Sequence, residues 1–193
     1  MSTDNARLVP LLSRRNVCRA SGALAVAAMA GCLADETSRE PVPDPVSVAG
    51  EACDACGMII GDHFGPNAQI HYEGDDPPAD REGPVWFDSL NEALAFHEMA
   101  AHRQARKHVM YVVDYSITDW TVTTHHDAPR LSSHTEPEAF LDIRETICVV
   151  GSEVHGAMGP DAIPFSRQAD AADFSADYGG DLTEGSALLE EVS

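Results

Sequence analysis

Two cysteines and a methionine lie within six residues of each other, at Cys53, Cys56 and Met58. The chain of 193 residues holds only five cysteines and six methionines, so this short stretch concentrates its sulfur. Thiolates and thioethers are ligands for soft metal ions, and a Cys-x-x-Cys pair can also exchange electrons as a dithiol. The stretch therefore indicates either a soft-metal site or a redox centre.

The residues after Cys56 count against a redox centre of the thioredoxin kind. Such a dithiol lies at the N-terminus of a helix, which lowers a thiol pKa, whereas Gly57 and Pro66 bound a segment too rich in glycine and proline to open a long helix. A structural zinc site stays open, because Cys53, Cys56, Cys148 and a histidine would supply four ligands. Cys148, however, lies in an apolar run, where a single cysteine is typically a small core residue.

Met158 is a second sulfur donor, and its position between Gly156 and Gly159 is unusual for a core methionine. Zinc seldom binds methionine, whereas Cu(I) accepts thiolate and thioether together at low coordination number, so Met58 and Met158 favour copper. His155 precedes Met158 closely and could complete a trigonal site. Four other histidines are expected on the surface: His71, His97, His102 and His108.

The elements that must position these residues follow a weak internal repeat. Phe87 and Phe96 are nine residues apart, and so are Phe165 and Phe174. A β-like run precedes each pair at a similar distance, at 68–72 and 146–151. The repeated unit is a strand, a loop, a second strand and a helix.

The second strands are expected at 85–88 and 163–166, followed by helices with Ser89 and Ser166 as N-caps. The second helix should end at Gly179. Further strands are expected at 110–114 and 120–124. The first helix has apolar residues and a histidine at helical spacing, namely Leu90, Ala93, Leu94 and His97. We therefore expect an α+β fold, in which two similar ββα modules form one compact domain with antiparallel sheet.

The first 31 residues have the features of an export signal. Arg14 and Arg15 precede a small apolar run, 20–30, which is about half the roughly 20 residues that a membrane-spanning helix needs. Paired arginines predict the twin-arginine route. Residues 29–32 resemble a lipobox, so we expect lipidation of Cys32 and anchoring on the outer face of the cytoplasmic membrane. An ordinary cleaved signal with an incidental cysteine is the alternative.

The chain is strongly acidic, with a formal charge of −20 that becomes −23 once the four arginines and one aspartate of residues 1–31 are removed. Such a surface excludes nucleic acid as a partner. The acidic residues are scattered through the sequence and not gathered in one block. This pattern favours adaptation to high salt over a docking surface for a cationic partner.

Composition divides the remaining chain into three parts. Residues 32–50 begin with the cysteine to be lipidated and continue as an acidic, proline-rich stretch that is expected to be a flexible tether. Residues 51–180 are expected to form the folded domain, with modules at about 51–117 and 118–180. Residues 181–193 are expected to be a mobile acidic tail.

Eight short motifs occur in order between residues 51 and 180. They are Cys56–Ile59, Gly65–Ile70, Trp86–Ser89, Tyr111–Asp114, Trp120, Val150–Ser152, Met158–Gly159 and Ile163–Phe165. Together they resemble the NosL family, the lipoprotein accessory factors of nitrous oxide reductase. The resemblance covers most of the chain that would remain after export.

The resemblance implies a Cu(I)-binding chaperone that hands copper by ligand exchange to nitrous oxide reductase or its assembly machinery, outside the cytoplasmic membrane. It also implies a fold similar to part of the organomercurial lyase fold. By motif, the thiolate ligand falls on Cys56 and the thioether on Met158, with Met58 and His155 as further candidates. Cys53 departs from the family pattern, and would be either a second thiolate or the disulfide partner of Cys56.

A binding protein that is not an enzyme is the leading hypothesis, and two other functions stay open. The first is a thiol enzyme, either a disulfide reductase or a lyase of carbon–mercury bonds, using Cys53, Cys56 or Cys148 with an acid such as Asp88. The second is a structural zinc domain that docks a partner. The sequence leaves open whether the chain is a monomer or a homodimer.

Overall fold

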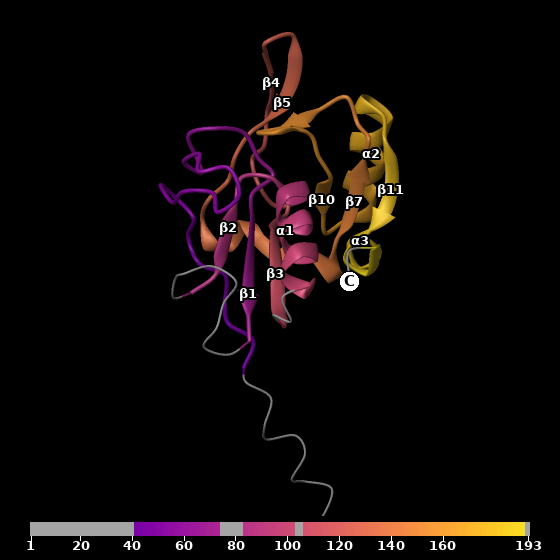
Figure 1. Ribbon diagram of the computed structural model, residues 1–193. Helices are drawn as coiled ribbons and strands as arrows, with labels where there is room; N and C mark the ends of the chain where they lie inside the picture. The colour runs from indigo at the N-terminus through magenta and orange to yellow at the C-terminus, as the bar shows by residue number, and fades with distance from the viewer. Residues whose placement is uncertain (1–40, 74–82, 103–105, 192–193) are drawn as a thin grey trace, which may run out of the picture. The chain divides into compact units, whose positions relative to one another are not determined.

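The computed structural model describes residues 41–73, 83–102 and 106–191. Its first sheet has the strand order β2-β1-β3-β6. Strand β1 is antiparallel to both of its neighbours, and helix α1 packs against β1 and β2 (Figure 1). The elements are β1 (Ala68–Tyr72), β2 (Val85–Phe87), α1 (Leu90–His102), β3 (Lys107–Val113) and β6 (Phe140–Asp142).

Helix α1 forms where the sequence supplies both a cap and an apolar stripe. The amide N–H of Glu92 donates to Ser89 Oγ at 3.2 Å, so Ser89 caps the first turn as expected. The stripe at helical spacing is buried against the sheet, and it consists of Leu90, Ala93, Leu94 and His97. The cap and the apolar stripe therefore start α1 directly after the end of β2.

The second sheet repeats the first, with the order β10-β7-β11. In both sheets the first strand of the module is central, and the second strand and the strand after the helix flank it antiparallel. This arrangement confirms the expected α+β fold with antiparallel sheets, and it adds a third strand to each expected ββα module. The elements are β7 (Ile147–Val150), β10 (Ile163–Phe165), α2 (Gln168–Tyr178), β11 (Asp181–Glu184) and α3 (Gly185–Glu191).

The two phenylalanine pairs that indicated the repeat are contacts between strand and helix. The ring centroids of Phe87 and Phe96 lie 5.2 Å apart, and those of Phe165 and Phe174 lie 5.3 Å apart. In each module the first ring comes from the second strand and the other from the helix. The nine-residue spacing is thus set by a strand, a short connection and two turns of helix packing back on that strand.

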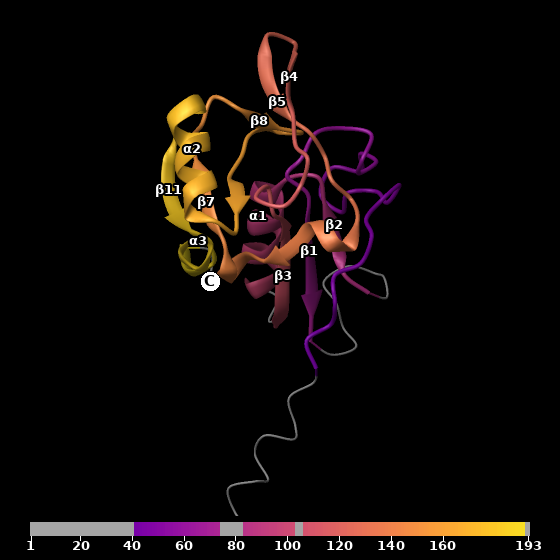
Figure 2. The same ribbon diagram turned by 180° about the vertical axis from the view of Figure 1, so that it is seen from behind.

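A third, four-stranded sheet is built from two hairpins in the order β4-β5-β8-β9. The hairpins pair in parallel at one point, Arg130 with His155. The hairpin of β4 and β5 projects beyond the rest of the unit in both views (Figures 1 and 2). The strands are β4 (Val122–His125), β5 (Ala128–Leu131), β8 (His155–Gly156) and β9 (Gly159–Pro160).

Residues 114–116 join the two modules. One carboxylate oxygen of Asp114 accepts the amide N–H groups of Ser116 and Ser166, both at 2.8 Å. The Tyr115 amide donates to Pro164 O at 3.0 Å, and the Tyr115 ring lies 6.3 Å from the ring of Phe165. Since buried apolar residues of both modules belong to one cluster, the modules share a single core.

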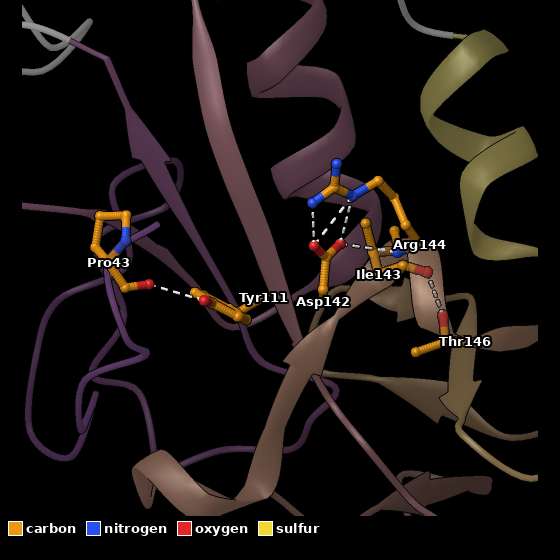
Figure 3. A network of polar contacts seen from close by, with 6 residues as sticks. All are labelled: Pro43, Tyr111, Asp142, Ile143, Arg144 and Thr146. Atoms are coloured by element: carbon orange, nitrogen blue, oxygen red, sulfur yellow. Dashed lines mark hydrogen bonds and ion pairs between the residues drawn. The ribbon is translucent and has the colours of Figure 1, made fainter. Parts of the chain in front are cut away.

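A network of polar contacts fastens the N-terminal segment and the chain between the two sheets (Figure 3). The Tyr111 hydroxyl donates to Pro43 O at 2.8 Å. The Arg144 guanidinium pairs with the Asp142 carboxylate across the short turn η2 (Ile143–Glu145), which follows η1 (Pro137–Ala139) and β6. This turn redirects the chain from β6 of the first sheet into β7 of the second.

Two boundaries expected from composition were wrong. The tether was expected to reach residue 50, but Val48 is fully buried and the Val46 amide donates to Gln69 Oε1 at 3.0 Å. The tail was expected from residue 181, but β11 pairs with β7 and α3 packs on η2. In both cases a few apolar side chains find partners far away in the sequence, which local composition does not reveal. Residues 1–40, with Cys32 and the expected export signal, lie outside the described residues.

Three further expectations were wrong. Ser166 does not cap α2, because Arg167 holds the N-cap position, without a side-chain hydrogen bond, and the Ser166 amide is bound to Asp114. His71 and His97 were expected on the surface, but both are buried by tertiary packing.

In the part of the chain that the structure describes, no helix is both long and apolar enough to cross a membrane.

Burial of His71 predicts a loss of stability in mild acid. Burial, reinforced by nearby His108, lowers the pKa of His71 to about 4, whereas an unfolded histidine has a pKa of about 6.5. Below pH 6.5 the unfolded chain takes up a proton that the folded chain refuses until about pH 4. The free energy of unfolding should thus fall by about 3 kcal/mol over this window, and remain unchanged by this group above it.

Urea unfolding of the parent and His71→Gln between pH 4 and 7.5 measures this contribution. The difference between the two free energies should change across the window, while exposed His63→Gln should follow the parent. A pH dependence in His71→Gln identical to that of the parent would contradict the assignment.

Candidate metal site

Cys53 and Cys56 lie in the turn of a small hairpin. Ala52 and Ile59 form an antiparallel bridge, and the Cys53 amide donates to Met58 O at 2.8 Å. The Gly57 amide donates to Cys53 O at 2.8 Å, with Gly57 at a φ of +79° that favours glycine. No helix follows, as the glycine and proline content predicted. The turn leaves Cys56 exposed and Cys53 buried.

The hairpin is fixed to the end of β2 by its own backbone and by one carboxylate. The Asp54 amide donates to Trp86 O at 2.8 Å, and the Trp86 amide donates to the Asp54 carboxylate at 2.7 Å. Strand β2 ends at Phe87, so this reciprocal pair places the two thiols beside the start of α1.

Two carboxylates from that junction meet the thiols. Cys53 Sγ donates to Glu92 Oε2 at 3.4 Å, and Cys56 Sγ lies 3.5 and 3.6 Å from the two carboxylate oxygens of Asp88. Ligand atoms of all four residues lie within 4.8 Å of one another. Among the described residues this is the group of thiol, imidazole and carboxylate side chains that could hold a metal ion.

Burial favours the protonated form of both thiols. It raises the pKa of Cys53 well above its ordinary value, against a hydrogen bond from the Asp88 backbone that lowers it. It raises the pKa of Cys56 as well, and there the Asp88 charge acts in the same direction. Burial, helped by Asp88, also raises the pKa of Glu92. Reactive dithiols lie beside positive charge, which lowers a thiol pKa, whereas two carboxylates face the thiols here. The site is therefore better suited to bind a cation than to attack a substrate.

The hairpin that contains Met158 is also attached to the first turn of α1. Met158 lies between β8 and β9 with 52% of its surface exposed. The side-chain amide of Asn91 donates to Pro160 O at 3.0 Å, and the backbone amide of Asn91 donates to Asp161 Oδ1 at 2.9 Å. Asn91 is the residue before Glu92, so the thioether hairpin and the thiol hairpin are attached to adjacent positions of α1.

The remaining predicted ligands are distributed as follows. Met58 is half-buried and follows the thiol turn directly. His155 is half-buried in β8, where it pairs with Arg130 and Pro160. Cys148 is fully buried in β7, where burial raises its pKa to about 12. Cys148 was expected in the core, and this is confirmed; the alternative zinc set that included it is not assembled in the described part of the chain.

Glu92 was missed by the sequence reasoning, and Asp88 was considered only as an acid for a thiol enzyme. Their spacing about Ser89, the expected N-cap of the first helix, was the available signal. Acidic residues at a helix N-terminus are common as partners of the helix dipole, so the spacing alone did not point to the cysteines. Contact with Cys53 and Cys56 depends on tertiary structure.

The chain is similar to known proteins of the NosL family. The sequence profile of the NosL family matches residues 45–192. The Copper-binding lipoprotein NosL of Achromobacter cycloclastes is 33% identical over 128 residues, which are 66% of this chain and 58% of that protein. The chain thus spans little more than half the length of this relative.

Two solved structures are similar. The crystal structure of the copper chaperone NosL from Shewanella denitrificans has a TM-score of 0.59 and 24% identity, over 75% of this chain and 94% of that one, and supports the fold. The solution structure of apo-NosL from Achromobacter cycloclastes has a TM-score of 0.38 and 26% identity, over 63% and 87%. With a family match across more than three quarters of the sequence, the chain belongs to the NosL family.

Proposed function

We propose that the chain is an extracytoplasmic metallochaperone that binds Cu(I) and delivers it by ligand exchange for the assembly of nitrous oxide reductase. The observation that carries the proposal is the convergence of Cys53 and Cys56 at an exposed turn beside the thioether hairpin. Two thiolates and one thioether are soft donors at the low coordination number that Cu(I) prefers. The copper relative named above is consistent with this cargo.

In this proposal Cys56 and Met158 are the exposed ligands and Cys53 is the buried one. Met58 and His155 lie on the same two hairpins and are the reserve donors. Carboxylate oxygens are hard donors that Cu(I) binds weakly, so Asp88 and Glu92 stay outside the ligand set. They accept hydrogen bonds from the thiols in the metal-free chain, and Cu(I) displaces those thiol protons when it binds. Because Cys56 and Met158 are exposed, a partner's ligand can reach the copper before the chain releases it.

The cellular setting is part of the same proposal. Export by the twin-arginine route and lipidation at Cys32 would hold the domain on the outer face of the cytoplasmic membrane, close to a membrane-bound assembly machinery. The lipoprotein character of the copper-binding relative supports an anchor. We place the signal at 1–31 and the copper-binding domain from about residue 42 onward, since the Val46 amide is hydrogen-bonded to Gln69 and Val48 is buried in the core.

The test is an anaerobic titration of the chain with Cu(I) against a coloured Cu(I) chelator, followed by mixing the loaded chain with copper-free nitrous oxide reductase. We expect the chain to retain Cu(I) against the chelator and to lose it to the reductase. Retention without transfer would leave a copper-binding protein and contradict the delivery role, and failure to retain Cu(I) would contradict the whole proposal.

Replacing the thioether should weaken copper binding without abolishing it. Met158→Leu keeps the size and apolar character of the side chain but removes one neutral donor, so the dissociation constant for Cu(I) should rise about tenfold, or about 1.4 kcal/mol. Met99→Leu is the matched control, because Met99 is 55% exposed on α1 and has no place in the site. Equal affinities of the two variants would remove Met158 from the ligand set.

A further inference from the structure

The hairpin that carries Met158 is held against α1 by one buried carboxylate. Asp161 follows β9 and is only 4% exposed. Its Oδ1 accepts the amide N–H groups of Asn91 and Ala162, both at 2.9 Å, and the hydroxyl of Ser89 also hydrogen-bonds to the carboxyl group. Asp161 thus joins the end of the hairpin to the capping residue and the first turn of α1.

The other carboxylate oxygen faces the opposite strand of the same hairpin. Asp161 Oδ2 is buried and has no hydrogen-bond partner among the described residues. A Cβ atom added to Gly156 would lie only 2.8 Å from it and 2.7 Å from Gly65 O. The carboxylate therefore fills the space between β8 and the helix, which only a glycine at position 156 leaves available.

Two further contacts act on the same hairpin. The Asn91 side chain donates to Pro160 O at 3.0 Å, and the Arg130 guanidinium donates to the carbonyl oxygens of Gly156 and Ala157. Both are made by residues at or near the surface and each reaches one strand end. Asp161 contacts the helix from inside the protein, so it sets the depth at which the hairpin lies.

The helix turn that Asp161 binds is the turn that faces the thiols. Asn91 stands between Leu90 and Glu92, and Glu92 accepts the hydrogen bond from Cys53. A carboxylate at this position fixes the distance between the thioether loop and the thiol loop, since both loops are attached to adjacent residues of one helix. Without it, the hairpin of Met158 would be held by the pairing of β8 with β5 and by the hydrogen bonds from Asn91 and Arg130.

We propose that Asp161 is the positioning residue for Met158, holding its hairpin at the start of α1 so that the thioether can reach copper bound by Cys53 and Cys56. The inference rests on the proposed Cu(I) function. Asp161 itself does not bind the metal and acts through Asn91, Ser89 and the hairpin backbone. Its substitution should thus remove the contribution of Met158 and leave that of the thiols.

The test is a double-mutant cycle on the full chain, with Cu(I) affinity measured anaerobically against a chelator and expressed per folded chain. Asp161→Ala should weaken binding about tenfold, as Met158→Leu does, and the double variant should be no weaker than either single one. Asp161→Asn keeps an oxygen for the amides of Asn91 and Ala162, and should bind within about twofold of the parent. X-ray absorption should show one sulfur neighbour fewer around copper in Asp161→Ala.

The outcomes separate this inference from the function. If the parent retains Cu(I) and Asp161→Ala weakens it equally with and without Met158, the role is general stability and the positioning role is overturned. An unchanged sulfur count in Asp161→Ala overturns it as well. Asn91→Ala, at an exposed residue, serves where Asp161→Ala folds poorly, and it should weaken binding only when Met158 is present. A parent that does not retain Cu(I) overturns both the function and the inference.

Discussion

Replacing Cys56 by serine should abolish tight Cu(I) binding while the chain stays folded. In the proposed site the exposed thiol is the ligand that both incoming copper and a partner can reach, and a serine hydroxyl is a hard, neutral donor that Cu(I) binds poorly. We expect the dissociation constant to rise on the order of a thousandfold, or about 4 kcal/mol, because a charged ligand is lost and not only a neutral one. Anaerobic competition against a chelator measures the change.

Cys148→Ser is the control for this result, because Cys148 is the third cysteine that the structure describes. Cys148→Ser lies in the core, so it should lower the free energy of unfolding but leave the Cu(I) affinity of the folded chain unchanged. Cys56→Ser should show the reverse, because its side chain contributes little to the core. Unfolding of metal-free Cys56→Ser would point to a structural metal site instead, and parental affinity would exclude Cys56 as a ligand.

Replacing Gly185 by alanine should lower the free energy of unfolding strongly, because the added Cβ atom has no room. A Cβ atom on Gly185 would lie 2.0 Å from Ile143 O and 2.5 Å from Thr146 Oγ1, two atoms that already bond to each other at 2.8 Å. The Gly185 amide also donates to Thr146 O at 2.9 Å, so the segment cannot move away without breaking that bond. We expect the free energy of unfolding to fall by about 3 kcal/mol, because α3 must leave its place against η2.

Thermal and urea unfolding of Gly185→Ala measures this loss, with Ser186→Ala as the neighbouring control. The control removes a hydroxyl but adds no atom near the backbone of η2. Cu(I) affinity of folded Gly185→Ala should equal that of the parent, since α3 and the thiol hairpin lie on opposite sides of the unit in both views (Figures 1 and 2). A melting temperature within about 2 °C of the parent would contradict the prediction, because it would mean that α3 and η2 move apart at little cost.

The sequence predicted the repeated architecture because local patterns in the chain form the repeat. The β-like run at 68–72 became β1 at the same residues, and the phenylalanine spacing marked a strand and a helix in both modules. The third strand of each module was harder to place within the repeat. Strand β11 is exposed over most of its length and pairs on one side only, so it lacks the alternation of a half-buried strand.

For the site, the sulfur residues were chosen from their types and spacing, and the structure brings Cys53 and Cys56 together. Residue type could not reveal their surroundings. Asp88 and Glu92 are ordinary residues at the start of a helix, and Asp161 is one acidic residue in a chain with 32. Each acquires its role through a contact at least 32 residues away in the sequence, as the hydrogen bond between Cys56 and Asp88 illustrates.

The buried carboxylate beside the exposed thiol also has a kinetic consequence. At physiological ionic strength the Debye length is about 8 Å and at molar salt about 3 Å, so the overall charge of −20 steers distant molecules only in dilute salt. Asp88 lies 3.5 Å from Cys56 Sγ and is shielded from solvent, where ions screen least. Anionic thiols and chelators should therefore approach this sulfur slowly even in brine, while a neutral or cationic exchange partner reaches it at an undiminished rate.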